Sequence, residues 1–165
     1  MAIMMQKQII SYKICRIIIA GSRDITDYRI VSKKADSVIK EIKTSRGDVS
    51  QLAIEIVSGG ARGVDLLGER YANEHGYALK RFPADWMKYG NAAGPIRNRR
   101  MLEYATDECD GAYGVLLAIW DGKSRGTRHM VDIATEKGIP VYRCLVPCSR
   151  ADLQRKEKED KKSKC

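Results

Sequence analysis

Short apolar runs rich in β-branched residues recur along the chain at regular intervals. They cover residues 14–20, 52–57, 77–82, 115–120 and 139–144, and each is bounded by glycine, proline or charged residues. Runs of this length without clear alternation of apolar and polar positions are typical of strands buried on both faces of a sheet. The pattern therefore predicts five buried strands.

Segments with helical periodicity lie between these runs. They cover residues 27–43, 62–75, 95–106 and 127–137. Gly76 and Gly138 directly follow two of them, as is common where a helix ends. Alternating strands and helices predict a single Rossmann-like, doubly wound α/β domain, with a mainly parallel sheet of five or more strands and helices on both faces.

The length and composition fit one domain with polar ends. A chain of 165 residues that is 44% hydrophobic can bury one sizeable core. We expect an N-terminal extension at 1–13, the domain at 14–148 and a charged C-terminal tail at 149–165. The apolar runs are far shorter than the roughly 20 residues that cross a bilayer, and the first residues lack a signal-peptide pattern. These features predict a cytoplasmic protein without a membrane partner.

The charge balance favours an anionic partner. The formal net charge is +9, from 30 basic and 21 acidic residues, and only part of the excess lies in the tail. A positive surplus on the folded part favours a polyanion or a phosphorylated small molecule. The five cysteines include no CxxC pair, and Cys144 and Cys148 have no second ligand pair nearby. We therefore expect reduced thiols, no metal and no cofactor.

Three loops of small residues follow the first, second and fourth predicted strands. With the common strand order 3-2-1-4-5, all three reach the carboxyl edge of the sheet near the reversal of strand order, where ligands bind. Glycines let a ligand approach backbone amides, and the helix that follows directs N–H groups and positive partial charge at it. We expect a phosphate-binding loop arrangement built from Gly21, Ser22 and Arg23; Ser58, Gly59, Gly60, Ala61 and Gly63; and Trp120, Gly122, Ser124, Gly126 and Thr127.

Further candidate residues lie in the helical segments. The stretch 97–100 concentrates cations at the start of a predicted helix, where the helix dipole disfavours them, so Arg97 and Asn98 are expected to bind an anion. Asp65 lies in the first turn of another helix, where it fits three readings: a favourable interaction with the dipole, a hydrogen bond to a ribose, or support for the Gly21 loop. Trp86 and Tyr89 are interpreted either as a stacking lid or as loop anchors.

Four motifs in this order resemble the SLOG superfamily, most closely its small, single-domain YspA-like members. The motifs are Gly21-Ser22-Arg23, the Ser58-Gly59-Gly60-Ala61-Arg62-Gly63-Val64-Asp65 loop, Pro95-Ile96-Arg97-Asn98-Arg99 and residues 122–127. The superfamily unites the Rossmann-like domain of DNA-processing protein A with the "lysine decarboxylase-like" phosphoribohydrolases. The resemblance spans about residues 16–142. It implies a Rossmann-like fold, a pocket for nucleotides or nucleotide-derived molecules, and a homo-oligomer.

The resemblance favours a binding function first. In the phosphoribohydrolases, a Gly-Thr pair is closely followed by a catalytic glutamate. Here Gly126-Thr127 is followed by Arg128, His129 and Met130, and the next acid is Asp132. We therefore expect a domain that senses or sequesters a nucleotide, an ADP-ribose relative or a signalling nucleotide.

Two alternatives remain open, so the sequence does not decide whether the chain is an enzyme. One is an N-glycosidic phosphoribohydrolase acting on nucleoside monophosphates, with Asp65, Asp121 or Asp132 in place of the glutamate. The other is a single-stranded DNA-binding protein similar to DNA-processing protein A. The net charge of +9 prompts it, and the rings available to stack on bases are Phe82, Trp86, Tyr89 and Trp120.

Overall fold

The protein folds around one parallel sheet. The computed structural model describes residues 13–45 and 52–147, and within them five strands pair in the order β3-β2-β1-β4-β5, all parallel. The strands are β1 (Ile14–Gly21), β2 (Ala53–Ser58), β3 (Ala78–Arg81), β4 (Ala112–Trp120) and β5 (Val141–Leu145). The predicted strand order and the Rossmann-like α/β fold are thereby confirmed.

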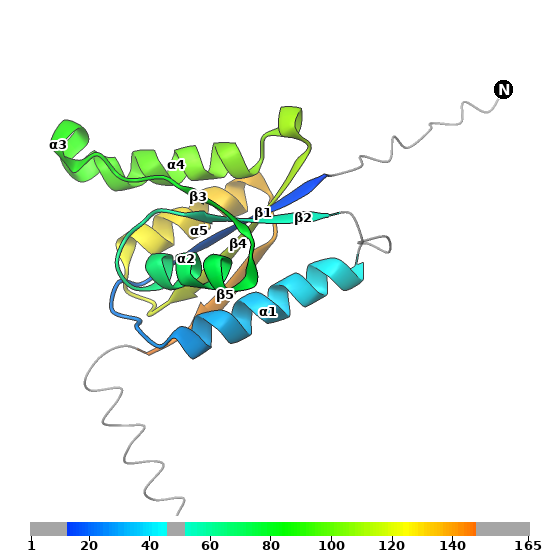
Figure 1. The fold of residues 1–165 in the computed structure, drawn as a ribbon. Helices are drawn as coiled ribbons and strands as arrows, with labels where there is room; N and C mark the ends of the chain where they lie inside the picture. The colour runs from blue at the N-terminus through cyan, green and yellow to red at the C-terminus, as the bar shows by residue number, and fades with distance from the viewer. Residues whose placement is uncertain (1–12, 46–51, 148–165) are drawn as a thin grey trace, which may run out of the picture.

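Four long helices cover the two faces of the sheet (Figure 1). They are α1 (Tyr28–Ser45) and α2 (Val64–His75) on one face, and α4 (Ala93–Ala105) and α5 (Arg125–Lys137) on the other. The short helix α3 (Trp86–Tyr89) and a 3-10 turn (Gly90–Ala92) precede α4, and a second 3-10 turn (Glu108–Asp110) precedes β4. These short elements were not predicted, because segments of three or four residues show no periodicity.

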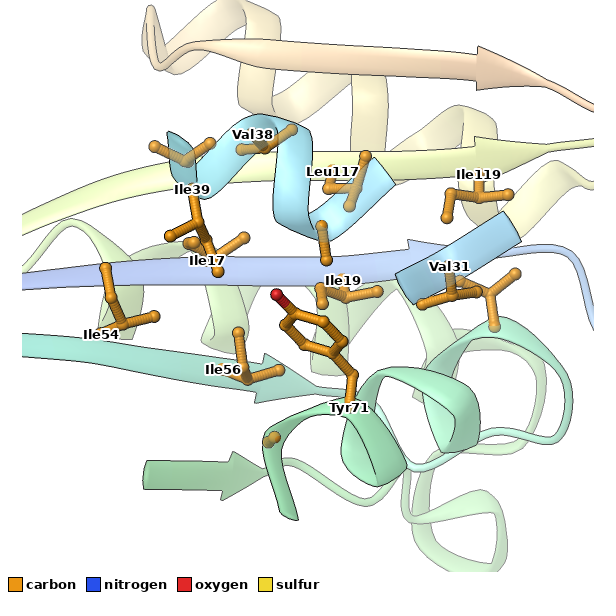
Figure 2. Close-up of a cluster of buried hydrophobic side chains, with 14 of the residues drawn as sticks. Ile17, Ile19, Val31, Val38, Ile39, Ile54, Ile56, Tyr71, Leu117 and Ile119 are labelled. Atoms are coloured by element: carbon orange, nitrogen blue, oxygen red, sulfur yellow. The ribbon is translucent and has the colours of Figure 1, made fainter. Parts of the chain in front are cut away.

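The sheet separates two hydrophobic layers. Along β1, Ile17 and Ile19 join the cluster beneath α1 and α2, whereas Ile18 and Ala20 join the cluster beneath α4 and α5. Figure 2 shows the first cluster, in which Tyr71 of α2 lies against the isoleucines of β1 and β2. Burial of β1 on both faces explains why its sequence is apolar without alternation.

β4 begins three residues earlier than predicted, at Ala112 rather than at Val115. A Cβ at position 114 would lie 2.8 Å from the carbonyl oxygen of Ala105, so β4 passes directly beneath the end of α4. Glycine permits this approach. Because glycine is uncommon in strands, Gly114 interrupted the apolar run, and the predicted strand therefore began too late.

The predicted ends of the chain lie mostly outside the described residues. Of the extension at 1–13, only Lys13 is described, and its N–H donates to the carbonyl of Gly111 at 3.1 Å. The tail at 149–165 falls outside the described ranges. No helix within the described ranges is long and apolar enough to span a membrane.

Candidate ligand-binding site

The loops after β1 and β4 are tied together at the carboxyl edge of the sheet. A Cβ on Gly21 would collide with the carbonyl of Ile119 and would lie 2.7 Å from Val64 Cγ2. The buried Ser22 Oγ accepts a hydrogen bond from the N–H of Asp121 at 3.0 Å. Gly21 and Ser22 therefore hold β1 close to β4 and to the start of α2.

Side chains of the Ser58–Asp65 motif accept hydrogen bonds from two amides of the loop between β2 and α2. Ser58 Oγ accepts from the N–H of Gly60 at 3.0 Å and donates to Glu69 Oε1 at 2.8 Å. The N–H of Ala61 donates to Asp65 Oδ2 at 3.3 Å. The amides of Gly60 and Ala61 are thus bonded within the protein, which differs from the expectation of bare amides. Two side chains of the same motif, Ser58 and Asp65, accept the hydrogen bonds that a phosphate was expected to accept from these amides.

Glycine is required at position 63 by the backbone conformation and by the close approach of another loop. Gly63 adopts φ +80°, and a Cβ there would lie 2.5 Å from the carbonyl oxygens of Ser22 and Arg23. Only glycine meets both requirements without strain. Gly63 therefore sets how closely α2 begins beside the loop after β1.

The loop between β4 and α5 is braced by its own side chains. Asp121 Oδ1 accepts from the N–H groups of Lys123 and Ser124, both at 2.8 Å. Burial raises the pKa of Asp121, but these hydrogen bonds outweigh burial and leave the pKa below its ordinary value. Trp120 Nε1 donates to the carbonyl of Ser124 at 3.1 Å, and Gly122 turns the chain at φ +81°.

Helix α5 begins at this loop and presents an open N-terminus. Ser124 Oγ accepts from the N–H of Thr127 at 3.4 Å and from its hydroxyl at 3.1 Å. A Cβ at Gly126 would meet nothing within 4 Å. The first N–H groups of a helix have no partner within it, and a Cβ-free position lies beside them, so binding of an anion at this end of α5 stays a prediction.

Helix α4 brings the guanidinium of Arg97 onto the β2–α2 loop. Its Nη1 donates to the carbonyl of Gly59 at 2.6 Å and lies 4.0 Å from Asp65 Oδ2. A Cβ on Gly59 would lie 2.6 Å from Arg97 Cζ and 2.7 Å from Asp65 Oδ2. What comes close to the bare backbone at Gly59 is therefore a side chain of the protein itself.

The Asp65 carboxyl and the Arg97 guanidinium are both strongly perturbed. Burial raises the pKa of Asp65 to about 6, although Arg97 and the backbone groups of Ala61 and Gly21 counteract the rise. Burial lowers the pKa of Arg97, Asp65 raises it and Arg23 lowers it. Arginine nevertheless stays charged at neutral pH. Asp65 is thus a carboxylate that gains a proton only slightly below neutrality.

Three cavities adjoin at this edge, because Arg23 and Arg97 line all of them. The central cavity, of about 300 Å³, lies between the loop after β1, Asp65 and the start of α5. The β2–β3 cavity, of about 460 Å³, is lined by Gly59, Gly60, Ala61 and Arg62 on one side and by Pro83, Ala84 and Trp86 on the other. The α4–α5 cavity, of about 260 Å³, is lined by Asn91, Gly94, Pro95, Arg125, Gly126 and His129, among others.

The linings are strongly basic. Their charged side chains are Arg23, Arg62, Arg97 and Arg125 on the positive side and Asp65 alone on the negative side. The Arg23 guanidinium carbon lies 5.8 Å from the centroid of the Trp86 ring, which is half exposed. The combined space can hold an anionic group and a flat ring side by side.

The structure brings most of the predicted site residues into these linings. They are Gly21, Arg23, Gly59, Gly60, Ala61, Asp65, Arg97, Asn98, Ser124, Gly126 and Thr127. The others lie behind the linings and support them: Ser22, Ser58, Gly63, Trp120 and Gly122. Of the carboxylates considered for catalysis, Asp65 lines the central cavity, whereas Asp121 holds the β4–α5 loop and Asp132 is exposed on α5.

Arg125 was not predicted as a site residue, because a basic residue at a loop tip is usually solvated. Its position beside Gly126 at the start of the predicted helix is the signal that could have identified it. Within the described residues, no group of three or more His, Cys, Asp or Glu side chains is placed to hold a metal ion.

The fold and site define a doubly wound α/β domain with a basic cleft where the strand order reverses. Residues 15–89 match the model of the YspA, cpYpsA-related SLOG family. A relative, the "Gene 61 protein" of Mycobacterium phage D29, is 34% identical over 131 residues, which cover 76% of this chain and 93% of that protein. The chain belongs to this SLOG family, and at a coarse level membership indicates a nucleotide-related ligand. No solved structure matches the chain.

Proposed function

We propose that this protein binds a nucleotide-derived ligand, which it senses or sequesters, with the anionic group among Arg23, Arg97 and Arg125 and the base beside Trp86. The observation that carries the proposal is the shared lining. Two arginines line all three cavities, and Asp65 is the sole carboxylate among the residues that line them.

The phosphate position follows from charge and geometry. Guanidinium groups match phosphate oxygens in pairs, and a helix N-terminus adds N–H groups and positive partial charge. Arg125 and Gly126 occupy the first two positions of α5, where they line both the central cavity and the α4–α5 cavity. A phosphate here would contact both kinds of donor.

The base position follows from the aromatic ring at the mouth of the β2–β3 cavity. Trp86 is 50% exposed and lines the β2–β3 cavity, and aromatic side chains are common in the linings of small-molecule sites. The cavity's volume of about 460 Å³ falls within the usual range for small-molecule sites. A base stacked on Trp86 would remain within reach of Arg23.

Isothermal titration calorimetry with AMP, cyclic AMP, NAD⁺ and ADP-ribose tests the proposal. We expect at least one of them to bind, and Arg23→Ala to weaken its binding about tenfold or more, since a charge-assisted hydrogen bond is lost. Arg29→Ala is the matched control, because Arg29 is an 89% exposed arginine that pairs with Asp27 and lines none of the three cavities.

Absence of binding by every ligand of the panel would overturn the proposal, as would equal losses in the two arginine variants. A single-stranded oligonucleotide belongs in the same panel, because DNA binding stays a prediction. Its binding should weaken steeply with added salt if phosphates carry it. Sedimentation of the same samples tests the predicted homo-oligomer.

Asp65 supports a second candidate, an N-glycosidic hydrolase acting on nucleoside monophosphates. It is a buried carboxyl with a pKa of about 6 that lines the central cavity, and such a group can stabilise a positively charged centre or transfer a proton. Chromatography for a released base and ribose 5-phosphate decides between the two candidates. Product formation that is lost in Asp65→Asn would favour hydrolysis, whereas unchanged substrate with concentrated protein would favour binding alone.

A further inference from the structure

The orientation of the buried Asn98 amide is fixed by its neighbours. Arg97 Nε can only donate, and it lies 3.0 Å from Asn98 Oδ1. The carbonyl of Gly126 can only accept, and it lies 3.1 Å from Asn98 Nδ2. The reverse orientation of the amide would set donor against donor and acceptor against acceptor, so the assignment does not depend on the placement of hydrogens.

This orientation in turn fixes the proton on His129. Asn98 Nδ2 also lies 3.1 Å from His129 Nδ1. An amide nitrogen only donates, so Nδ1 of His129 must accept, and the neutral ring carries its proton on Nε2. Burial lowers the pKa of His129 and Arg99 lowers it further, while Asp132 raises it. The ring is therefore neutral near pH 7.

The Nε2–H group of His129 donates no hydrogen bond to the described residues of the free protein. Among the described residues, Nε2 has no hydrogen-bond partner, and no buried side-chain nitrogen or oxygen is left unpaired. Nε2 is therefore accessible. His129 lines the α4–α5 cavity together with Arg23, Arg97 and Arg125, and no carboxylate lines that cavity.

Building on the proposed function, we propose that His129 is a specificity-determining residue whose Nε2–H donates a hydrogen bond to the ligand's phosphate in the α4–α5 cavity. Asn98 is its positioning residue, because it holds the ring and its tautomer while it also caps the carbonyl of Gly126. The chemical class of the bound group follows from the side chains that line the α4–α5 cavity. Arginine and the Nε2–H tautomer only donate, so the group they receive is an acceptor with negative charge.

Nitrogen-15 NMR of the histidine side chains tests the first half of the inference without any ligand. The chain has two histidines, and His75 on α2 is the internal reference. We expect His129 in the Nε2–H form at pH 7.5. A Nδ1–H tautomer would contradict the hydrogen-bond assignment and overturn the inference. The resonances of His129 should then shift on addition of the bound nucleotide, whereas those of His75 should not.

Calorimetry with AMP and ADP-ribose, and with adenosine as an uncharged comparator, tests the second half. His129→Ala should weaken binding of the phosphorylated ligands about tenfold or more, because a hydrogen bond to a charged group is lost. His129→Gln should recover most of the loss, since the amide nitrogen of glutamine can replace Nε2–H. Affinity for adenosine should not change in either variant. His75→Ala is the matched control and should bind as the wild type does.

The outcomes separate the inference from the proposed function. If the wild-type protein binds no ligand of the panel, both fail. If it binds AMP or ADP-ribose and His129→Ala binds them equally well, only the role of His129 fails. An equal loss for adenosine and AMP would also overturn it, because His129 would then act on the nucleoside or on the fold and not on the phosphate.

Discussion

The Arg97 guanidinium and the Asp65 carboxylate lie 4.0 Å apart in a nearly buried setting, with side chains only 12% and 6% exposed. At this distance they attract each other without a direct hydrogen bond. Arg97 also donates to the carbonyl of Gly59, so its position does not depend on Asp65 alone. In the free protein, the Arg97 guanidinium thus lies beside the Asp65 carboxylate, and we propose that the same guanidinium binds the anionic group of the ligand.

Protonation of Asp65 should strengthen the binding of an anionic ligand. The pKa of Asp65 is about 6, so the carboxylate repels the ligand above that pH and becomes neutral below it. Arg97 on α4 attracts Asp65, Glu69 lies one turn further along the same helix, and Arg23 lines the same central cavity. We expect the affinity for ADP-ribose, whose pyrophosphate keeps its charge, to rise several-fold from pH 7.5 to pH 5.5.

Calorimetry across that pH range with Asp65→Asn is the control. The variant is neutral throughout, so its affinity should change much less with pH. Burial lowers the pKa of His129 below its ordinary value, and this ring also gains protons as the pH falls, so the difference between wild type and variant is what reports Asp65. The same pH dependence in both proteins would contradict this role.

Asp65 should also make folding depend on pH. Its pKa is raised in the folded state from the ordinary value of 3.8, so between about pH 4 and pH 6 the folded protein binds a proton more tightly than the unfolded chain does. The contribution of Asp65 to stability should therefore fall as pH rises through that window and stay constant above it. The expected loss is on the order of 2–3 kcal/mol. Denaturant unfolding of wild type and Asp65→Asn at pH 4.5 and pH 7.5 measures it, and a difference between the two proteins that does not change with pH would refute it.

Alanine at Gly59 and alanine at Gly21 should have different effects. At Gly59 the new Cβ meets the far end of the Arg97 side chain, which can move, so ligand binding should be lost while the fold survives. At Gly21 it meets the backbone of Ile119 in β4, which cannot move without separating the strands. We expect a decrease in stability of about 3 kcal/mol or more for Gly21→Ala and about 1 kcal/mol for Gly59→Ala. Thermal unfolding with calorimetry on both variants checks this, and equal destabilisation would contradict it.

The buried Arg16 should stabilise the fold without affecting the ligand. It lies near the start of β1, away from the site, and forms ion pairs with Glu55 at 3.0 Å and Asp110 at 2.8 Å while donating to the carbonyl of Tyr104 at 2.7 Å. Arg16→Met removes the cation from both carboxylates and leaves Glu55 Oε1 with only the Tyr104 hydroxyl, which donates to it at 2.7 Å, so it should lower the free energy of unfolding by about 3 kcal/mol. Urea unfolding measures the loss. Arg29→Met, at an exposed arginine, should change stability by less than about 0.5 kcal/mol.

The sheet was predictable because its strands are buried on both faces. Ile17, Ile18 and Ile19 are all apolar since consecutive side chains enter different hydrophobic layers, and such runs are visible without a structure. The crossover rules for parallel strands then limited the topology to a few choices. The start of β4 was missed because Gly114 there serves packing against α4 and not strand propensity.

The site was predictable as a place, but its internal contacts were not. The sequence indicated which loops meet, because that depends on strand order alone. It did not indicate that Ser58 and Asp65 accept hydrogen bonds from the amides of Gly60 and Ala61. Nor did it indicate that Arg97 donates to the carbonyl of Gly59. Those contacts depend on how α4 lies against the β2–α2 loop, and a single sequence carries no signal for that distance. The same holds for the Asn98–His129 bond.

The position of Trp86 gives the protein an optical signal of its own. The chain contains two tryptophans: Trp86 lies beside Arg23 at the β2–β3 cavity, and Trp120 is bonded to the β4–α5 loop. A molecule that stacks on the half-exposed indole would exclude water from it and would shift or quench its emission. Trp86→Phe would leave Trp120 as a separate reporter. Binding of such a molecule would thus be measurable in unlabelled protein, at concentrations too low for calorimetry.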